Sequence, residues 1–293
     1  MSTSRVGFSV IIPTFDRPER LRATLASVVA LDPPAREIII VDGDPSGSAR
    51  EVVKFHAGRV THVASHPGLT RQRNAGMRVA RESLILFLDD DVAVKTDLLA
   101  RLGRAFADDA VVGATGLVIE PSGGRRIGKT SRLRKVLFGG GNEGGFTRFG
   151  YPRRVVDPGV EQDVSFMPGC FMSIRRTVAL RVEFDEELPG YGLAEDEDFA
   201  LRLSRLGRIR YLPDAVVHHK NLGFLTKDSR AFDRQVVLNR TYLFRKNFHP
   251  TALARAQFGL FVLLLVAHRL INREWRGAQG LLEGAWLAWR LPR

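Results

Sequence analysis

The chain has 293 residues, of which 44% are hydrophobic and 26% charged, an ordinary globular composition with enough length for one large domain and an appendage. Its single cysteine, Cys170, excludes an internal disulfide and fits a reducing compartment. The formal net charge of +12 favours a polyanionic partner: nucleic acid, an anionic membrane surface or a phosphorylated small molecule. A solvated basic surface explains the charge equally well.

Short apolar runs alternate with helix-like segments through the first 120 residues. We predict strands at 8–13, 37–43, 59–64, 84–89 and 110–119. We predict helices at 17–30, 48–56, 70–81 and 96–107. This alternation indicates βαβ units and a largely parallel sheet, and therefore an α/β fold.

The middle of the chain, from about 120 to 160, is rich in glycine and arginine and has no clear periodicity. We predict a long mobile loop over a site, because long loops in compact domains are usually functional or disordered. Ordered structure is expected to resume at residue 163. It should contain a helix at 196–206, strands at 208–212 and 215–219, and a helix at 231–246.

The tail at 251–290 predicts two helices with a break near Asn272–Gly277. Its apolar run at 258–267 is shorter than the roughly 20 residues that span a bilayer, so we expect it not to span one. Flanking arginines and tryptophans favour contact with an anionic membrane surface. A helical hairpin that packs on the first domain or forms a dimer is the alternative. We therefore divide the chain into residues 1–247 and 248–293.

Polar and acidic residues follow the predicted strands where these end. Pro13, Thr14 and Phe15 end the first strand, Asp42 follows the second, and Asp89–Asp91 follow the fourth. Ligands of parallel α/β sheets bind at the carboxyl ends of the strands. We therefore expect these residues to lie along one edge of the sheet.

The three adjacent acids Asp89–Asp91 need a positive partner, because like charges this close raise each other's pKa. A hard divalent cation fits, since Mg²⁺ typically binds one or two carboxylates together with substrate phosphates. The alternative is that the acids stabilise the positive end of the helix that begins near residue 96.

Seven segments carry a family resemblance, in order and at similar spacing: SVIIPTFDRPERLRATLASV, EIIIVDGDPSG, GLTRQRNAGMRVA, LILFLDDDV, MPGCFMSIRR, YGLAEDEDFALRLSRLG and YLPDAVVHH. Together they resemble the family 2 glycosyltransferases over roughly residues 7–247. The resemblance implies a GT-A fold, with a Rossmann-like, mostly parallel central sheet flanked by helices and a C-terminal helical appendage. It also implies a bacterial, non-processive sugar transferase of cell-envelope glycan synthesis.

The resemblance implies a nucleotide-sugar donor, linked to UDP, dTDP or GDP, and Mg²⁺ or Mn²⁺ as cofactor. Pro13, Thr14 and Phe15 would line the base pocket. Asp42 would accept a hydrogen bond from the base; a turn-forming role is its alternative. Asp42 is the family match in this chain, where Gly43 separates it from the second acid of the turn.

The remaining donor contacts are also implied by the resemblance. Arg73 would bind the diphosphate or the base, because its fork of donors suits anions, and Arg71 is its rival. Asp89 would contact the ribose, with Asp90 in the same donor site. Asp91, the second acid of the D-x-D motif, would hold the metal.

The acidic segment that begins with Glu195-Asp196 matches the catalytic pair of the family. We expect Asp196 to be the general base that takes a proton from the acceptor hydroxyl as the new bond forms. A single base opposite the leaving group implies one displacement and inversion of the anomeric centre. The alternative is that these acids only favour the positive end of a helix.

His218 and His219 follow the last predicted strand, and only one of them should face the site because neighbours on a strand point to opposite faces. His219 matches the family's histidine and would help to ligate the metal; a surface pair is the alternative. Gly169, Tyr191 and Gly192 would shape the acceptor pocket. Cys170 is interpreted as a small packing residue rather than a nucleophile.

The leading interpretation is therefore an inverting glycosyltransferase that acts on a glycan or a lipid-linked acceptor. We expect it in the cytoplasm, peripheral on the inner face of the cell membrane, without a nucleic-acid partner. The oligomeric state is not readable from the sequence. One alternative is a nucleotidyltransferase, but this chain lacks the glycine-rich phosphate loop that such an enzyme needs after the first strand. The other is a basic nucleic-acid-binding protein, but the acidic strand ends of this chain would repel phosphates.

Overall fold

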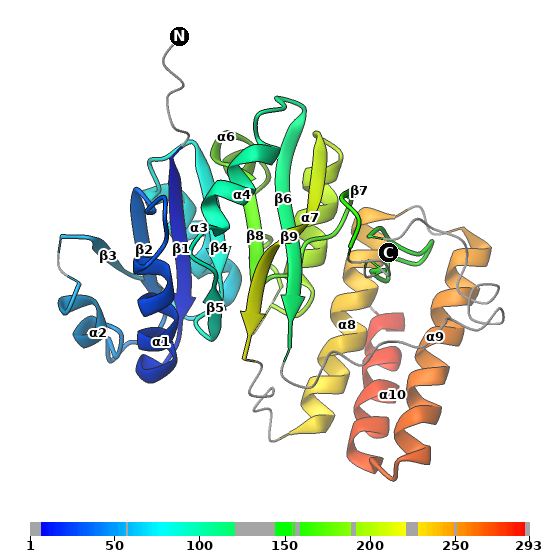
Figure 1. The fold of residues 1–293 in the computed structure, drawn as a ribbon. Helices are drawn as coiled ribbons and strands as arrows, with labels where there is room; N and C mark the ends of the chain where they lie inside the picture. Colours follow the sequence, from blue (N-terminus) through cyan, green and yellow to red (C-terminus); the bar gives the residue numbers. More distant parts are fainter. Residues whose placement is uncertain are drawn as a thin grey trace. The chain divides into compact units, whose positions relative to one another are not determined.

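The computed structural model describes residues 7–56, 58–120, 144–153, 155, 159–188, 192–220, 228–248 and 251–290. The chain forms two compact units (Figure 1). The first unit combines Met1–Arg126 with Val155–Asn221, and the second combines Ile127–Arg154 with Leu222–Arg293. The functional division after residue 247 stays a prediction. Most of the expected loop, residues 121–143, lies outside the described residues.

The first unit is built on one mixed sheet with the strand order β3-β2-β1-β4-β8-β6-β9-β5 and with β7 paired to β9 (Figure 1). The strands are β1 (Phe8–Thr14), β2 (Glu37–Asp42), β3 (Val60–Ala64), β4 (Leu84–Leu88), β5 (Val92–Val94), β6 (Val111–Ile119), β7 (Gln162–Val164), β8 (Phe171–Arg175) and β9 (Arg208–His219). The first four strands in chain order are parallel, as the βαβ alternation predicted.

The second half of the sheet differs from a simple succession of βαβ units. β8 enters between β4 and β6 and is antiparallel to both. β9 is parallel to β6, while β5 and β7 are antiparallel to β9. The two strands expected at 208–212 and 215–219 are one strand, β9, whose pairing with β6 shifts register between Gly116 and Leu117. The short strand β5 was not predicted, because three residues carry too little pattern.

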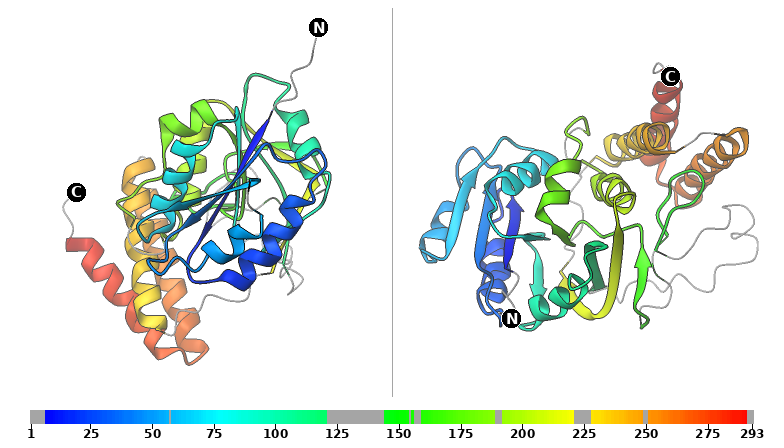
Figure 2. Two further views of the ribbon diagram at one scale, coloured as in Figure 1. Left: turned by 90° about the vertical axis from the view of Figure 1, so that its left-hand side faces the viewer. Right: turned by 90° about the horizontal axis from the view of Figure 1, so that it is seen from above.

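Helices cover both faces of this sheet (Figure 2). α1 (Pro18–Val29), α2 (Arg50–Lys54) and α4 (Leu98–Ala105) pack on one face. α3 (Leu69–Val79), α6 (Arg176–Val182) and α7 (Glu195–Ser204) pack on the other. The sheet is therefore the middle layer of three.

Strand β4 shows why the central strands are almost wholly apolar. Leu84, Leu86 and Leu88 belong to the core on one face, and Ile85 and Phe87 to the core on the other. All five side chains are fully buried, because a sheet with helices on both faces leaves neither side to water. Each such burial stabilises the fold by about 1.5–3 kcal/mol.

The second unit is a bundle of α8 (Ser229–Asn247), α9 (Ala252–Ile271) and α10 (Trp275–Arg290). The break expected near 272–277 is confirmed, since α9 ends at Ile271 and α10 begins at Trp275. Glycines bring α10 close to α8: a Cβ on Gly280 would lie 2.1 Å from the carbonyl oxygen of Arg230. A core of Val237, Val262, Val266, Ala278 and Leu281 joins the three helices.

Within the described residues, α9 is the one helix with the length and composition to cross a membrane. It has 20 residues, and its 18-residue window of mean hydropathy 1.5 is 22% buried. The apolar run at 258–267 was expected to be too short to span a bilayer, but the helix that contains it extends beyond the run at both ends. Length therefore does not exclude a spanning helix.

Candidate active site

The carboxyl ends of β1, β2 and β4 meet at one edge of the sheet, as predicted for parallel strands. Thr14 is paired with Asp42 across β1 and β2. The Thr14 hydroxyl donates a hydrogen bond of 2.7 Å to the Asp90 carboxylate, which follows β4. Residues separated by up to 76 positions in the chain are thus in direct contact at this edge.

Asp89, Asp91 and His219 form a cluster whose ligand atoms all lie within 4.8 Å of one another. The register of β5 and β9 sets this contact, because Val92 is paired with His219 and places Asp91 beside it. The distance from Nε2 of His219 to Oδ1 of Asp91 is 3.1 Å. His218 is exposed, so His219 is the member of the pair that faces the acids.

Charges around the cluster perturb its members in opposite directions. The hydrogen bond to Asp91 raises the pKa of His219, although burial opposes the rise. Burial alone would raise the pKa of Asp91, but His219, Arg17 and Arg20 bring it below its ordinary value. Asp91 and His219 therefore form a carboxylate–imidazole pair. Either a proton or a cation can bind between the two side chains.

The chemistry of this donor set fits a divalent metal ion. Two carboxylates and one imidazole are ligands that divalent metals accept, and three protein ligands leave positions for water or a substrate oxygen. Positive charge among these acids would relieve their repulsion. Asp89, Asp91 and His219 are therefore the residues that could hold the ion.

Asp90 points away from this cluster and stabilises the turn. Its carboxylate accepts from Thr14 and lies 3.5 Å from Nη1 of Arg17. Burial, followed by the charges of the neighbouring acids, raises the pKa of Asp90 to about 6, while Thr14 and Arg17 limit the rise. The predicted donor contact of Asp90 stays a prediction.

Asp42 is 1% exposed and its carboxylate is held within the protein. It accepts hydrogen bonds from the backbone N–H groups of Asp44 and Ala49, at 3.0 and 3.2 Å, and contacts His62 at 3.1 Å. These are the contacts of a turn-forming residue, the alternative that the sequence left open. Of the residues predicted to line the base pocket at the end of β1, Pro13 is buried in the strand, whereas Phe15 follows the strand and is 49% exposed.

Arg73 is the largest fully buried side chain among the described residues, and it joins two of the acidic segments. Nη1 of Arg73 lies 2.7 Å from the Glu195 carboxylate, and Nη2 lies 3.2 Å from the Asp89 carboxylate. Nη2 also donates a hydrogen bond of 3.0 Å to the carbonyl oxygen of Gly169. The rival Arg71 is exposed and lies 3.8 Å from Glu186, so it is not part of this network.

The helix α7 begins at the acidic pair, with Glu195 buried and Asp196 partly exposed. Asp196 accepts hydrogen bonds from the backbone N–H of Gly169 at 2.8 Å and of Glu197 at 2.9 Å. Burial and then the charge of Asp196 raise the pKa of Glu195 to about 8, while Arg73 limits the rise. The two carboxylates thus differ in environment: one is buried on an arginine, and the other is oriented by backbone donors.

Gly169 fits tightly between these groups. A Cβ at this position would lie 3.1 Å from Nη2 of Arg73 and 3.3 Å from Oε1 of Glu195. Gly192 has a φ of +70° and is buried near Thr70, so its backbone conformation favours glycine. Cys170 is buried, and burial raises the pKa of its thiol, which fits the packing interpretation. Tyr191 lies outside the described residues.

Two buried polar residues that sequence reasoning missed hold this edge of the sheet. The Thr24 hydroxyl donates to the carbonyl oxygens of Asp90 and Val92, at 2.8 and 2.9 Å, and so fixes the acidic turn from α1. Gln72 donates to the carbonyl oxygens of Thr14 and Val41, at 2.7 and 3.0 Å, and fills the space over Gly43. For Thr24 the available signal was a polar residue on an otherwise apolar helix face. The buried face of α3 is itself largely polar, so Gln72 carried no such signal.

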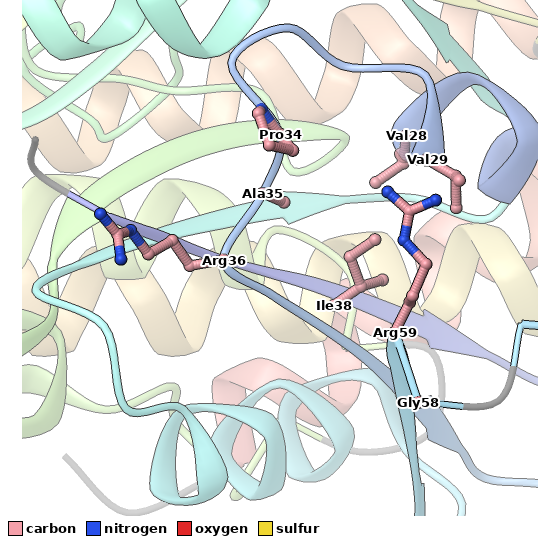
Figure 3. A pocket seen from close by; sticks show the side chains of 8 residues that line it. All are labelled: Val28, Val29, Pro34, Ala35, Arg36, Ile38, Gly58 and Arg59. Atoms are coloured by element: carbon pink, nitrogen blue, oxygen red, sulfur yellow. The ribbon is translucent and has the colours of Figure 1, made fainter.

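A separate small pocket lies at the amino ends of the strands, near the start of β2 and the end of α1 (Figure 3). Arg59 reaches across it toward Val28 and Val29, whereas Arg36 points away (Figure 3). The acidic residues lie at the opposite, carboxyl edge of the same strands. This pocket is therefore not part of the candidate site.

Comparison with known proteins agrees with this arrangement. The model of the family described as "Glycosyl transferase family 2" matches residues 9–182. The poly(ribitol-phosphate) beta-N-acetylglucosaminyltransferase TarP of Staphylococcus aureus (strain N315) is 28% identical over 144 residues, which are 46% of this chain and 41% of that protein. The poly-beta-1,6-N-acetyl-D-glucosamine synthase of Staphylococcus epidermidis is 26% identical over 135 residues, 44% of this chain and 31% of the synthase. The chain thus spans well under half the length of these relatives.

Solved structures share the fold at low sequence identity. The mannosyltransferase PcManGT from Pyrobaculum calidifontis, in complex with GDP-Man and Mn²⁺, has a TM-score of 0.61 at 16% identity. That match covers 98% of this chain and 88% of the mannosyltransferase. GalNAc-T7, with UDP, GalNAc and Mn²⁺, has a TM-score of 0.60 at 17% identity. That match covers 81% of this chain and 48% of the GalNAc-T7 chain.

Proposed function

Because this chain belongs to glycosyl transferase family 2 and has the GT-A fold that its motifs predicted, we propose that it is an inverting, metal-dependent glycosyltransferase. It would move one sugar from a nucleoside diphosphate to a hydroxyl group of an acceptor. The observation that carries this proposal is the buried guanidinium of Arg73, which contacts both Asp89 in the metal cluster and Glu195 beside Asp196. Arg73 therefore links the proposed donor acids to Glu195, the residue next to the proposed base.

The metal would be held by Asp89, Asp91 and His219. Its contribution when bound is to neutralise charge on the diphosphate leaving group. Because Mg²⁺ prefers oxygen ligands and the cluster includes an imidazole, we propose Mn²⁺ over Mg²⁺. The Mn²⁺ in the PcManGT and GalNAc-T7 structures supports this choice.

The donor is a nucleotide sugar: the PcManGT structure contains GDP-Man, and the GalNAc-T7 structure contains UDP and GalNAc. Phe15, exposed beyond β1, would stack on the base, and the neighbouring Pro13 and Thr14 would form the pocket wall. We retain Asp42 as a residue that shapes the base pocket from its turn. The choice among UDP, dTDP and GDP is left to the binding experiment below.

In the transfer step, the acceptor oxygen bonds to the anomeric carbon as the bond from that carbon to the diphosphate oxygen breaks. The hydroxyl proton moves to the carboxylate of Asp196, and the electron pair of the broken bond leaves with the nucleoside diphosphate. Backbone donors from Gly169 and Glu197 hold the Asp196 carboxylate in place. A single base implies one displacement and therefore inversion.

Arg73 and Glu195 would orient this base rather than contact the sugar. Arg73 is 1% exposed, so its guanidinium acts on buried partners instead of reaching into solvent. It holds Glu195 and the Gly169 carbonyl group, and Gly169 in turn donates to Asp196. Gly169, Gly192 and Tyr191 are proposed to border the acceptor, which we take to be a cell-envelope glycan or a lipid-linked precursor in the cytoplasm.

Calorimetry of the full chain with UDP-, dTDP- and GDP-sugars, with and without Mn²⁺, tests this proposal. We expect one nucleotide class to bind in a Mn²⁺-dependent manner. Asp196→Asn should retain that binding while turnover falls at least about a hundredfold. Asp163→Asn, an exposed acid on β7, is the matched control. Near-normal turnover of Asp196→Asn would assign the base to another residue, and metal-independent binding of every donor would remove the metal from the mechanism.

A further inference from the structure

All three tryptophans of the chain lie on α10, and all three are exposed. Trp275, Trp286 and Trp289 are 62%, 50% and 82% exposed, and Leu282 between them is 54% exposed. Their spacing of 7, 4 and 3 residues places the four side chains along one face of the helix. Tryptophan is enriched where an apolar body meets a polar boundary, as at a membrane surface.

The outward face of α9 is equally apolar. Leu253, Leu263, Leu264, Leu270 and Ile271 are exposed and follow helical spacing along the whole length of this helix. The opposite face already supplies the bundle core through Val262 and Val266. The exposed leucines are therefore not used for folding of the second unit, and an exposed apolar face of this length marks an interaction surface.

The charge of the bundle indicates the kind of surface that it meets. Residues 229–290 contain ten arginines and lysines but three acidic residues. Each of those acids has an arginine partner: Asp233 and Glu274 contact Arg269, and Glu283 contacts Arg230. The remaining positive charge is complementary to anionic lipid headgroups.

We propose that the outward faces of α9 and α10 bind an anionic lipid bilayer, with both helices lying in the headgroup region. The three helices share one core, so a bundle that entered the hydrocarbon would carry the charged α8 with it. Charged side chains are costly there. An interfacial position instead places the leucines and tryptophans in the acyl boundary and leaves the arginines at the phosphates.

The tryptophans of the chain are a built-in probe of this binding. Titration of the full chain with vesicles of phosphatidylglycerol and phosphatidylcholine should shift tryptophan emission to the blue, and vesicles of phosphatidylcholine alone should bind at least about tenfold more weakly. Lipids brominated near the headgroup should quench the emission more than lipids brominated near the chain ends. Quenching strongest at the bilayer centre would overturn the interfacial position, because it would place α10 in the hydrocarbon.

Matched variants locate the surface. Trp275→Ser/Trp289→Ser, with Trp286 kept as fluorophore, should lose at least about tenfold in vesicle affinity. The control is Phe55→Ser, which removes an aromatic side chain that is 79% exposed on the other unit and should leave affinity unchanged. Arg273→Gln/Arg290→Gln should lose about fivefold per arginine. Equal losses in the control, or unchanged affinity of both helix variants, would overturn the assignment.

The competing occupant is a second copy of the chain. Sedimentation of the full chain without lipid should show a monomer whose mass the tryptophan substitutions do not change. A dimer that these substitutions dissociate, together with no binding to anionic vesicles, would show that the face is a protein interface. Neither vesicle binding nor sedimentation depends on sugar transfer, so failure of this proposal is distinct from failure of the proposed activity.

Discussion

Replacement of Arg73 by methionine tests the buried network most directly. The substitution keeps an unbranched side chain of similar reach and removes the charge that contacts Glu195 at 2.7 Å and Asp89 at 3.2 Å. Loss of one partner from a buried ion pair typically costs about 3–5 kcal/mol, because the other charge stays buried and unpaired. The guanidinium also lies 5.2 Å from the centre of the Phe184 ring, a contact that adds to the loss.

The structure predicts where within this range the cost falls. Burial and the charge of Asp196 raise the pKa of Glu195 to about 8 even beside Arg73, so this carboxyl group already holds a proton at neutral pH and removal of Arg73 leaves no buried negative charge there. A neutral acid is cheaper to bury than a charge, and we expect a destabilisation of about 3 kcal/mol, the low end. Asp89 is partly exposed and water screens it. Arg73→Met/Glu195→Gln should cost less than the sum of the single changes, with a coupling of about 1–3 kcal/mol.

Urea unfolding followed by circular dichroism measures these costs, and tryptophan emission gives a second signal from the bundle that contains α10. Arg71→Met is the control, because Arg71 sits on the same helix but is exposed. We expect it to change stability by less than about 0.5 kcal/mol. Additive effects of Arg73→Met and Glu195→Gln, or a cost for Arg73→Met no larger than that of its control, would refute the network as a coupled unit.

The other predictions concern the metal and pH. Asp91→Ala should weaken Mn²⁺ binding at least about tenfold by calorimetry, whereas Asp109→Ala, which changes a fully exposed acid, should not; equal affinities would remove Asp91 from the metal site. Because Asp91 raises the pKa of His219, Mn²⁺ affinity should fall as acid protonates the imidazole, and His219→Asn should flatten that dependence. Glu195 retains a proton in the folded state that the unfolded chain releases, so stability should fall as pH rises from about 4.5 to about 8; Glu195→Gln should reduce this slope, and an unchanged slope would assign it to other groups.

The first four strands and their acids were predictable because the signals are local. A continuous apolar run in β1, β2 or β4 specifies a strand buried on both faces, and the parallel arrangement brings the strand ends together. The residues alone did not separate Arg73 from Arg71 or His219 from His218, and the family resemblance favoured Arg73 and His219. In each pair both residues are basic, and only packing decides which one contacts the acidic residues of the site.

The limits of the helices that were predicted agree to within a few residues, but α6 and the division of roles among the acids were not predicted. Asp89, Asp90 and Asp91 are adjacent in the sequence, yet the middle one turns back to Thr14 while its neighbours reach the cluster with His219. Alternate side chains in an extended turn point to opposite sides. The direction of each depends on Thr24 of α1, whose hydroxyl fixes the turn by a contact that lies 66 positions away in the chain.

The antiparallel strand β8 explains why the proposed base lies beside the donor acids at all. Phe171 at the start of β8 is paired with Leu88 at the end of β4, so the residues that precede β8 lie next to those that follow β4. A parallel strand at this position would have placed Gly169 and Cys170 at the opposite edge of the sheet. Gly169 then accepts from Arg73 and donates to Asp196, which ties the start of α7 to the same edge. The site therefore depends on one reversal of strand direction, a pairing set by residues about 83 positions apart that no local pattern specifies.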